Sequence, residues 1–151
     1  LMRYLFFLAT LLSPLVASAQ VIHTLTHPVG GPGTSFGGRV VNVGDLDGDG
    51  TAELAISGYG NTSGSPAGAG RVYVFRGRSW EVLRTLISPN EQENGFFGAG
   101  VAAAGDLDGD SVPDVLVGAT YEARPNRPNG GRAYAFSGAT GAPLFELALP
   151  A

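Results

Sequence analysis

The sequence repeats itself with a period of 61 residues. Residues 29–89 align with residues 90–150 without a gap, and 17 of the 61 positions are identical. Repetition at a fixed spacing is typical of proteins built from stacked copies of one supersecondary unit. The chain is therefore predicted to contain two units that share one fold.

Each unit is predicted to form four β-strands. The 24 glycines and 10 prolines divide the chain into short segments, and Tyr73 and Phe75 alternate with Val72 and Val74 at the two-residue period of a strand. The expected strands lie at 38–44, 53–57, 71–75 and 82–87, and again at 100–105, 114–118, 132–136 and 144–149. Four-stranded antiparallel units of this length are typical of β-propeller blades, so the predicted fold class is all-β.

A leading segment continues the repeat toward the N-terminus. Residues 21–28 lie 61 residues before residues 82–89 and share Val, Thr, Leu and Pro with them. Residues 20–28 are therefore predicted to be the outer strand of a preceding blade, followed by blade 1 at 29–89 and blade 2 at 90–151. His23 and His27 fall on one face of this strand, but no third metal ligand accompanies them. They are predicted to be exposed.

The first residues have the pattern of an export signal. Arg3 supplies a positive charge, residues 4–16 are mainly apolar, and residues 17–19 read Ala-Ser-Ala, a small-residue cleavage site. A membrane anchor is the alternative, but it needs about 20 apolar residues, and this shorter run contains Pro14. A signal peptide is predicted at 1–19. The mature chain is predicted to be extracellular or periplasmic, without membrane insertion.

Two acidic loops, residues 45–53 and 106–114, carry carboxylates at loop positions 1, 3, 5 and 9. Ca²⁺ takes six to eight oxygen ligands, which alternate carboxylates and one backbone carbonyl can supply. An EF-hand needs a Glu at position 12, where this chain has Ile56 and Val117, and it needs flanking helices. The alternative is a plain acidic turn, but a repeated cluster of like charges favours a bound cation. Two Ca²⁺ sites are predicted.

Charge and composition exclude some partners. The formal net charge is −4, all nine basic residues are arginine, and eight of the thirteen acidic residues lie in the two loops. With Ca²⁺ bound, no strong net field remains to attract nucleic acid or an anionic membrane. The chain has no cysteine, so calcium rather than disulfides is the predicted stabiliser of the exported protein.

The motifs occur together and in the same order in both units. An aromatic–glycine pair (Phe36-Gly37, Phe97-Gly98) precedes the acidic loop, and Gly-Arg followed by an aromatic strand follows it at 70–75 and 131–136. This pattern resembles the FG-GAP repeats of integrin α-subunit β-propellers and their bacterial secreted relatives. It departs from the family at the GAP tripeptide, and Ser111 replaces the glycine at position 6 of the second loop.

The resemblance implies two sets of calcium ligands and a separate partner-binding face. Thr51 and Val112 would contribute backbone carbonyls and the acidic residues their carboxylates. The implied ligands are Asp45, Asp47, Asp49, Thr51, Glu53, Asp106, Asp108, Asp110, Val112 and Asp114. In such propellers the partner-binding loops lie opposite the calcium loops. The candidate contact residues there are Tyr59, Tyr121, Arg124 and Arg127.

Two classes of function remain from the sequence. The favoured one is a non-catalytic secreted module for adhesion or for binding an extracellular protein or glycan. The alternative is the propeller part of a polysaccharide-active enzyme, or a structural spacer. An enzyme needs a nucleophile with its base or paired carboxylates. The acids outside the loops form no such constellation: Glu81, Glu91, Glu93, Glu122 and Glu146.

The number of blades predicts that the propeller is incomplete. Propellers close with about four to eight blades, and the sequence supplies two and a leading strand. The missing blades are expected to come from a longer chain, which is favoured because Leu1 precedes Met2. Homo-oligomerisation is the alternative.

Overall fold

The computed structural model describes residues 22–29, 33–60 and 66–147. The predicted signal peptide lies outside them. Within this part of the chain the elements are β1 (Phe36–Gly44), β2 (Glu53–Gly58), β3 (Arg71–Phe75), β4 (Val82–Leu86), β5 (Phe97–Gly105), β6 (Asp114–Ala119), β7 (Arg132–Phe136) and β8 (Pro143–Leu147). The same residues contain no helix with the length and hydropathy needed to cross a bilayer.

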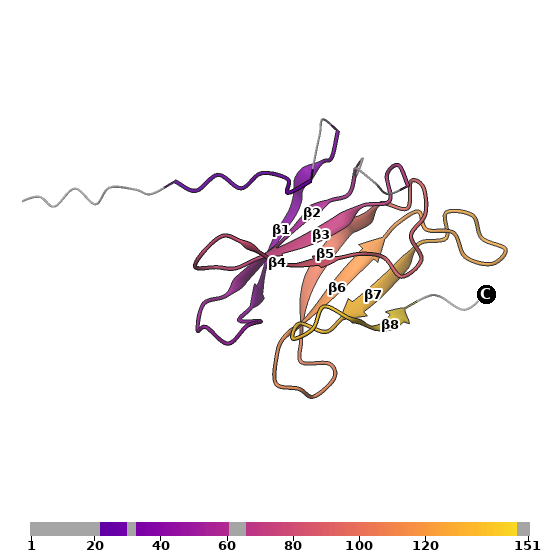
Figure 1. Ribbon diagram of the computed structural model, residues 1–151. Helices are drawn as coiled ribbons and strands as arrows, with labels where there is room; N and C mark the ends of the chain where they lie inside the picture. The colour runs from indigo at the N-terminus through magenta and orange to yellow at the C-terminus, as the bar shows by residue number, and fades with distance from the viewer. Residues whose placement is uncertain (1–21, 30–32, 61–65, 148–151) are drawn as a thin grey trace, which may run out of the picture.

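The strands form two four-stranded antiparallel sheets, in the orders β1-β2-β3-β4 and β5-β6-β7-β8 (Figure 1). Their registers are equivalent, since Ile56 pairs with Tyr73 and Val117 pairs with Tyr134. The predicted all-β fold with two four-stranded blades is confirmed, and the two sheets do not form a closed ring. β1 begins earlier than predicted because an irregularity after Phe36, at a glycine with φ of +85°, lets Phe36 pair with Gly58.

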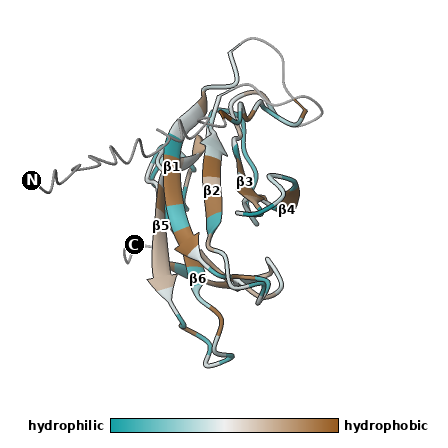
Figure 2. Ribbon diagram, turned by 90° about the vertical axis from the view of Figure 1, so that its left-hand side faces the viewer, coloured by the Kyte–Doolittle hydropathy of each residue, from teal (hydrophilic) through white to brown (hydrophobic). Residues whose placement is uncertain are grey.

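The two sheets pack face to face, and the main apolar core lies between them. β1 and β5, the first strand of each blade, lie next to each other (Figures 1 and 2). The core includes Val43, Ala55, Val72, Val74 and Leu86 from blade 1, and Phe97, Val115, Val117, Tyr134 and Phe136 from blade 2. Burying one such side chain contributes about 1.5–3 kcal/mol, so blade stacking is a main source of stability.

A second apolar cluster covers the opposite face of blade 1. Ile56, Tyr73 and Phe75 are buried there, and Leu25 from the N-terminal segment packs against them. The His27 ring contacts the Tyr73 ring edge-on at 4.9 Å, and Nε2 of His27 lies 3.3 Å from the Tyr73 hydroxyl. Burial lowers the pKa of His27.

The N-terminal segment corrects one prediction and leaves another open. His23 is exposed as predicted, whereas His27 is half-buried because it fills the space over Tyr73. Residues 22–29 join neither sheet. A strand there would need an inner strand from another blade as its partner, so the outer strand at 20–28 remains a prediction.

Loops gather at the two ends of the sheets in different combinations. At one end each acidic loop contacts the turn between the third and fourth strands of its own blade, because the Glu53 carboxylate accepts a hydrogen bond from Gly77 N. At the other end the remaining loops are joined by backbone hydrogen bonds, including Gly60 N to Thr34 O and Tyr121 N to Gly95 O. We call this second end the loop face.

Candidate metal centres

Each acidic loop folds around the carboxylate at its first position. Asp45 accepts hydrogen bonds from Gly48 N and Gly50 N, both at 2.8 Å. Asp106 accepts the equivalent bonds from Gly109 N at 2.7 Å and Ser111 N at 2.9 Å. These bonds between residues close in sequence make the loop conformation a local property of the motif.

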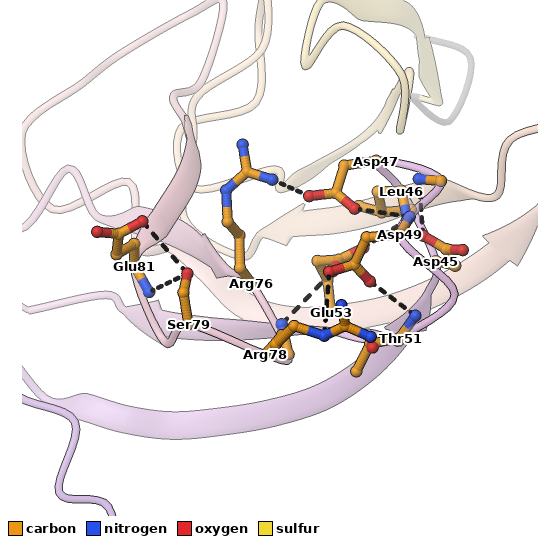
Figure 3. Close-up of polar contacts among 12 residues, drawn as sticks. Asp45, Leu46, Asp47, Asp49, Thr51, Glu53, Arg76, Arg78, Ser79 and Glu81 are labelled. Atoms are coloured by element: carbon orange, nitrogen blue, oxygen red, sulfur yellow. Dashed lines mark hydrogen bonds and ion pairs between the residues drawn. The ribbon is translucent and has the colours of Figure 1, made fainter.

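The carboxylates at positions 3 and 5 are oriented in the same way. Asp47 accepts from Asp49 N at 3.2 Å, and Asp49 accepts from Thr51 N at 2.8 Å (Figure 3). In the second loop Asp108 accepts from Asp110 N at 3.1 Å, and Asp110 from Val112 N at 2.8 Å. Each of these side chains therefore uses one oxygen to hold the loop and keeps further acceptor capacity for a ligand.

The structure brings most of the predicted carboxylates together. Ligand oxygens within 4.8 Å of one another come from Asp45, Asp47, Asp49 and Glu53 in the first loop, and from Asp106, Asp108 and Asp114 in the second. Asp110 does not belong to the second group. Clustered hard oxygen donors fit Ca²⁺, with backbone carbonyls and water available to complete six to eight ligands. The assignment of Thr51 and Val112 as carbonyl ligands stays a prediction.

The acidic residue at position 9 has a second task that the sequence did not reveal. Glu53 and Asp114 are fully buried. Asp114 accepts hydrogen bonds from Leu107 N at 2.6 Å and from Gly138 N at 2.9 Å, and Glu53 makes the equivalent contacts with Leu46 N and Gly77 N. This carboxylate therefore ties the start of the acidic loop to the turn between the third and fourth strands.

Close packing of this turn explains a repeated glycine. A Cβ atom at Gly77 would lie 2.2 Å from the carbonyl oxygen of Ala52, and one at Gly138 would lie 1.7 Å from that of Pro113. Only glycine lets the turn approach the acidic loop closely enough for the buried carboxylate to reach its backbone N–H. The identity of Gly77 and Gly138 in the repeat was the sequence signal for this contact.

The two loops differ in their charged neighbours. The Arg76 guanidinium forms an ion pair with Asp47, and Nε of Arg78 lies 4.0 Å from Asp49 Oδ2 (Figure 3). The equivalent residues beside the second loop are Ser137 and Ala139. None of the ion pairs in the described chain involves the second loop. Desolvation, followed by the other carboxylates of that loop, raises the pKa of Asp108.

The serine at position 6 of the second loop keeps the conformation of the glycine it replaces. Ser111 has φ of 71°, close to the value of 82° at Gly50. Both loops thus make the same tight turn, although a left-handed conformation costs an L-residue about 1–2 kcal/mol. The local hydrogen bond from Ser111 N to Asp106 helps to hold it.

On the loop face, the structure separates the four predicted contact residues into two groups. Tyr59 and Tyr121 both pack edge-on against Phe96, with ring-centre distances of 6.5 and 5.5 Å. A cavity of about 280 Å³ at this position is lined by Arg39, Tyr59, Phe96, Ala99, Thr120 and Tyr121. Sequence reasoning missed Phe96 and Arg39, which come from strand termini rather than from the long loops.

Arg124 and Arg127 belong to a neighbouring hairpin and do not line this cavity. Their backbones pair with each other, and the Arg124 guanidinium donates to the carbonyl of Gly130 at 2.8 Å. Arg124 is half-buried and holds its own loop together, whereas Arg127 is exposed. Only Arg127 is presented fully to solvent.

Two stacked four-stranded sheets, each with an acidic loop between its first two strands, define a β-propeller repeat protein. The FG-GAP repeat profile matches residues 36–75 and 97–136, which correspond to the span from the first to the third strand of each blade. The chain belongs to the FG-GAP repeat family.

Its relatives include integrin α-subunits. Integrin alpha-5 of Xenopus laevis is 34% identical over 104 residues, covering 60% of this chain and 10% of the integrin. Integrin alpha-11 of Homo sapiens is 32% identical over 114 residues, covering 74% and 9%. Integrin alpha-M of Mus musculus is 35% identical over 120 residues, covering 74% and 10%. The chain thus spans about a tenth of the length of these relatives.

Proposed function

We propose that this chain is a secreted, calcium-binding FG-GAP module that binds an extracellular protein or glycan without catalysing a reaction. The observation that carries the proposal is the repeated convergence of carboxylates at one end of the blades. The opposite end is left to carry longer loops and exposed aromatic side chains. Metal binding and partner binding are thereby assigned to opposite ends of one scaffold.

Calcium is proposed to act as a structural ion. The acidic loop joins the first two strands of each blade, and its buried position-9 carboxylate reaches the turn between the last two. A cation bound there would neutralise the clustered charges and fix both hairpins relative to each other. The rigid blade would then hold the loops at the other end for binding.

Partner binding is proposed at the cavity around Phe96. Aromatic rings provide contact area at low entropic cost, and Arg39 adds hydrogen-bond donors on the cavity wall. Tyr121 is half exposed, although its ring packs against Phe96. This combination suits a polar ligand with an apolar surface, such as a sugar ring or a peptide segment.

The acids outside the loops support a non-catalytic role. Glu91 is paired with Arg71, Glu146 with Arg132, and the Glu122 carboxylate accepts a hydrogen bond from the Tyr134 hydroxyl. Each therefore contributes to a contact between neighbouring segments of the fold. A catalytic pair would instead present two carboxylates to a shared cleft.

Calorimetric titration of the metal-free chain with CaCl₂ tests the calcium assignment. Two sites are expected, and Asp47→Ala or Asp108→Ala should each remove one. At a free Ca²⁺ concentration of a hundred times Kd, each site adds about 2.7 kcal/mol to the free energy of unfolding. Equal melting midpoints in EDTA and in millimolar Ca²⁺ would contradict the proposal.

Arrays of extracellular proteins and glycans, probed with the chain in Ca²⁺, test partner binding. Tyr121→Ala should weaken capture while leaving the melting midpoint in Ca²⁺ unchanged. Arg127→Ala, in the neighbouring hairpin, is the matched control for an effect confined to the cavity. If only acidic-loop variants alter capture, the partner does not bind at the loop face.

A further inference from the structure

The two blades have equivalent sequences but unequal cover on equivalent faces. The face of blade 1 that packs against blade 2 includes Leu46 and Leu86, which are 3% and 2% exposed. The corresponding residues of blade 2 are Leu107 and Leu147, which are 43% and 51% exposed. Blade 2 therefore presents outward the same kind of face that blade 1 buries.

This outward face of blade 2 is hollowed. A depression of about 260 Å³ is lined by residues that include Ala102, Leu116, Ala133 and Leu147. Four valines of blade 1 correspond to alanines in blade 2, at the pairs 41/102, 43/104, 72/133 and 74/135. Smaller side chains leave room here for a bulkier surface than the one that blade 1 meets.

The opposite face of blade 1 offers such a surface. The residues of blade 2 that receive blade 1 include Val115 and Val117, and their equivalents in blade 1 are the larger Leu54 and Ile56. The aromatic residues are the same, because Phe36, Tyr73 and Phe75 correspond to Phe97, Tyr134 and Phe136. Added volume on this face offsets part of the volume missing from blade 2.

The N-terminal segment covers this face of blade 1 incompletely. Val40 is 57% exposed, whereas its equivalent Val101 is half-buried against the main core. Val40 is the register partner of Ile56, which places both on the same face of the sheet. An apolar strip beside the segment is therefore free to be covered.

We propose that the outward face of blade 2 binds the Val40–Ile56 face of blade 1 in a second copy of this chain. The contact would repeat, between chains, the packing already present between blades 1 and 2. Because the two faces differ, the interface is heterologous, and such interfaces build closed rings when the rotation between copies closes. Two, three or four copies would give rings within the known range of about four to eight blades.

Docking requires the N-terminal segment to move. Leu25 packs against Ile56, Tyr73 and Phe75, and it occupies the repeat position of Leu86 and Leu147. Leu147 of the incoming copy would take the place of Leu25. The segment can leave because residues 22–29 have no strand pairing to either sheet.

Sedimentation of the chain and of two face variants tests the proposal. Val40→Glu and Leu147→Glu each place a charge on one face at an exposed position, so the monomer should still fold, as checked by its circular dichroism melt. The unmodified chain should sediment as two to four copies, and each variant alone as a monomer. An equimolar mixture should form a two-chain species, since Val40→Glu keeps blade 2 intact and Leu147→Glu keeps blade 1 intact.

Tyr121→Glu is the matched control, because Tyr121 is as exposed as Leu147 but lies on the loop face. It should associate like the unmodified chain. A monomeric unmodified chain up to its solubility limit would overturn the proposal. So would folded face variants that associate normally, a mixture that fails to pair, or loss of association in Tyr121→Glu.

Discussion

Replacing the buried position-9 carboxylate separates its role in the fold from its role as a metal ligand. In Asp114→Ala, the N–H groups of Leu107 and Gly138 lose their acceptor, and each donor left without a partner costs about 1–3 kcal/mol. The expected loss is about 2–6 kcal/mol in the free energy of unfolding. Relief of repulsion from exposed Asp106 and Asp108 opposes this loss weakly, because water screens those charges.

The measurement is thermal unfolding in EDTA, where neither loop holds calcium. For a domain of this size, 1 kcal/mol corresponds to roughly 4 °C, so Asp114→Ala should lower the midpoint by roughly 8–24 °C. Asp108→Ala is the control: it removes a proposed ligand that is exposed and accepts one hydrogen bond, from Asp110 N. Its midpoint in EDTA should barely change, while its gain on adding Ca²⁺ should fall by one site.

Two results would refute this reasoning. If Asp114→Ala matched the unmodified chain in EDTA, the buried hydrogen bonds would contribute nothing and position 9 would be only a metal ligand. If Asp108→Ala destabilised the metal-free protein as much as Asp114→Ala does, burial would not distinguish the two positions.

Three further predictions follow from particular contacts. Arg76→Ser should tighten calcium binding to the first loop by up to about fivefold in a calorimetric titration, because the competing ion pair with Asp47 is worth at most about 1 kcal/mol; Ser137→Arg should weaken the second site. Ser111→Gly should raise the free energy of unfolding by about 1 kcal/mol in denaturant titrations, because glycine adopts φ of 71° without strain; an unchanged midpoint would contradict this. His27 has a lowered pKa when packed, so its packing is complete above pH 6.5 and weakens as the pH falls below that value. The single tryptophan lies against His23, so its fluorescence should report this transition, and His27→Phe should abolish it.

The sequence by itself determined the fold class and the form of the acidic loops. Strand positions follow from apolar segments ended by glycine, and the 61-residue repeat makes each assignment twice. The loop ligands also lie close together in sequence, so hydrogen bonds such as Gly48 N to Asp45 form within the motif. Local features of this kind do not depend on distant residues.

Only the tertiary structure decided which members of these motifs are buried, paired or covered. Glu53 is fully buried because Gly77, 24 residues away, approaches its loop. Asp47 has an ion-pair partner because Arg76, 29 residues away, lies beside it at the end of β3. Leu86 and Leu147 occupy the same repeat position, yet one is 2% and the other 51% exposed. The repeat makes these leucines equivalent in sequence, and the presence or absence of a neighbouring blade makes them different in the fold.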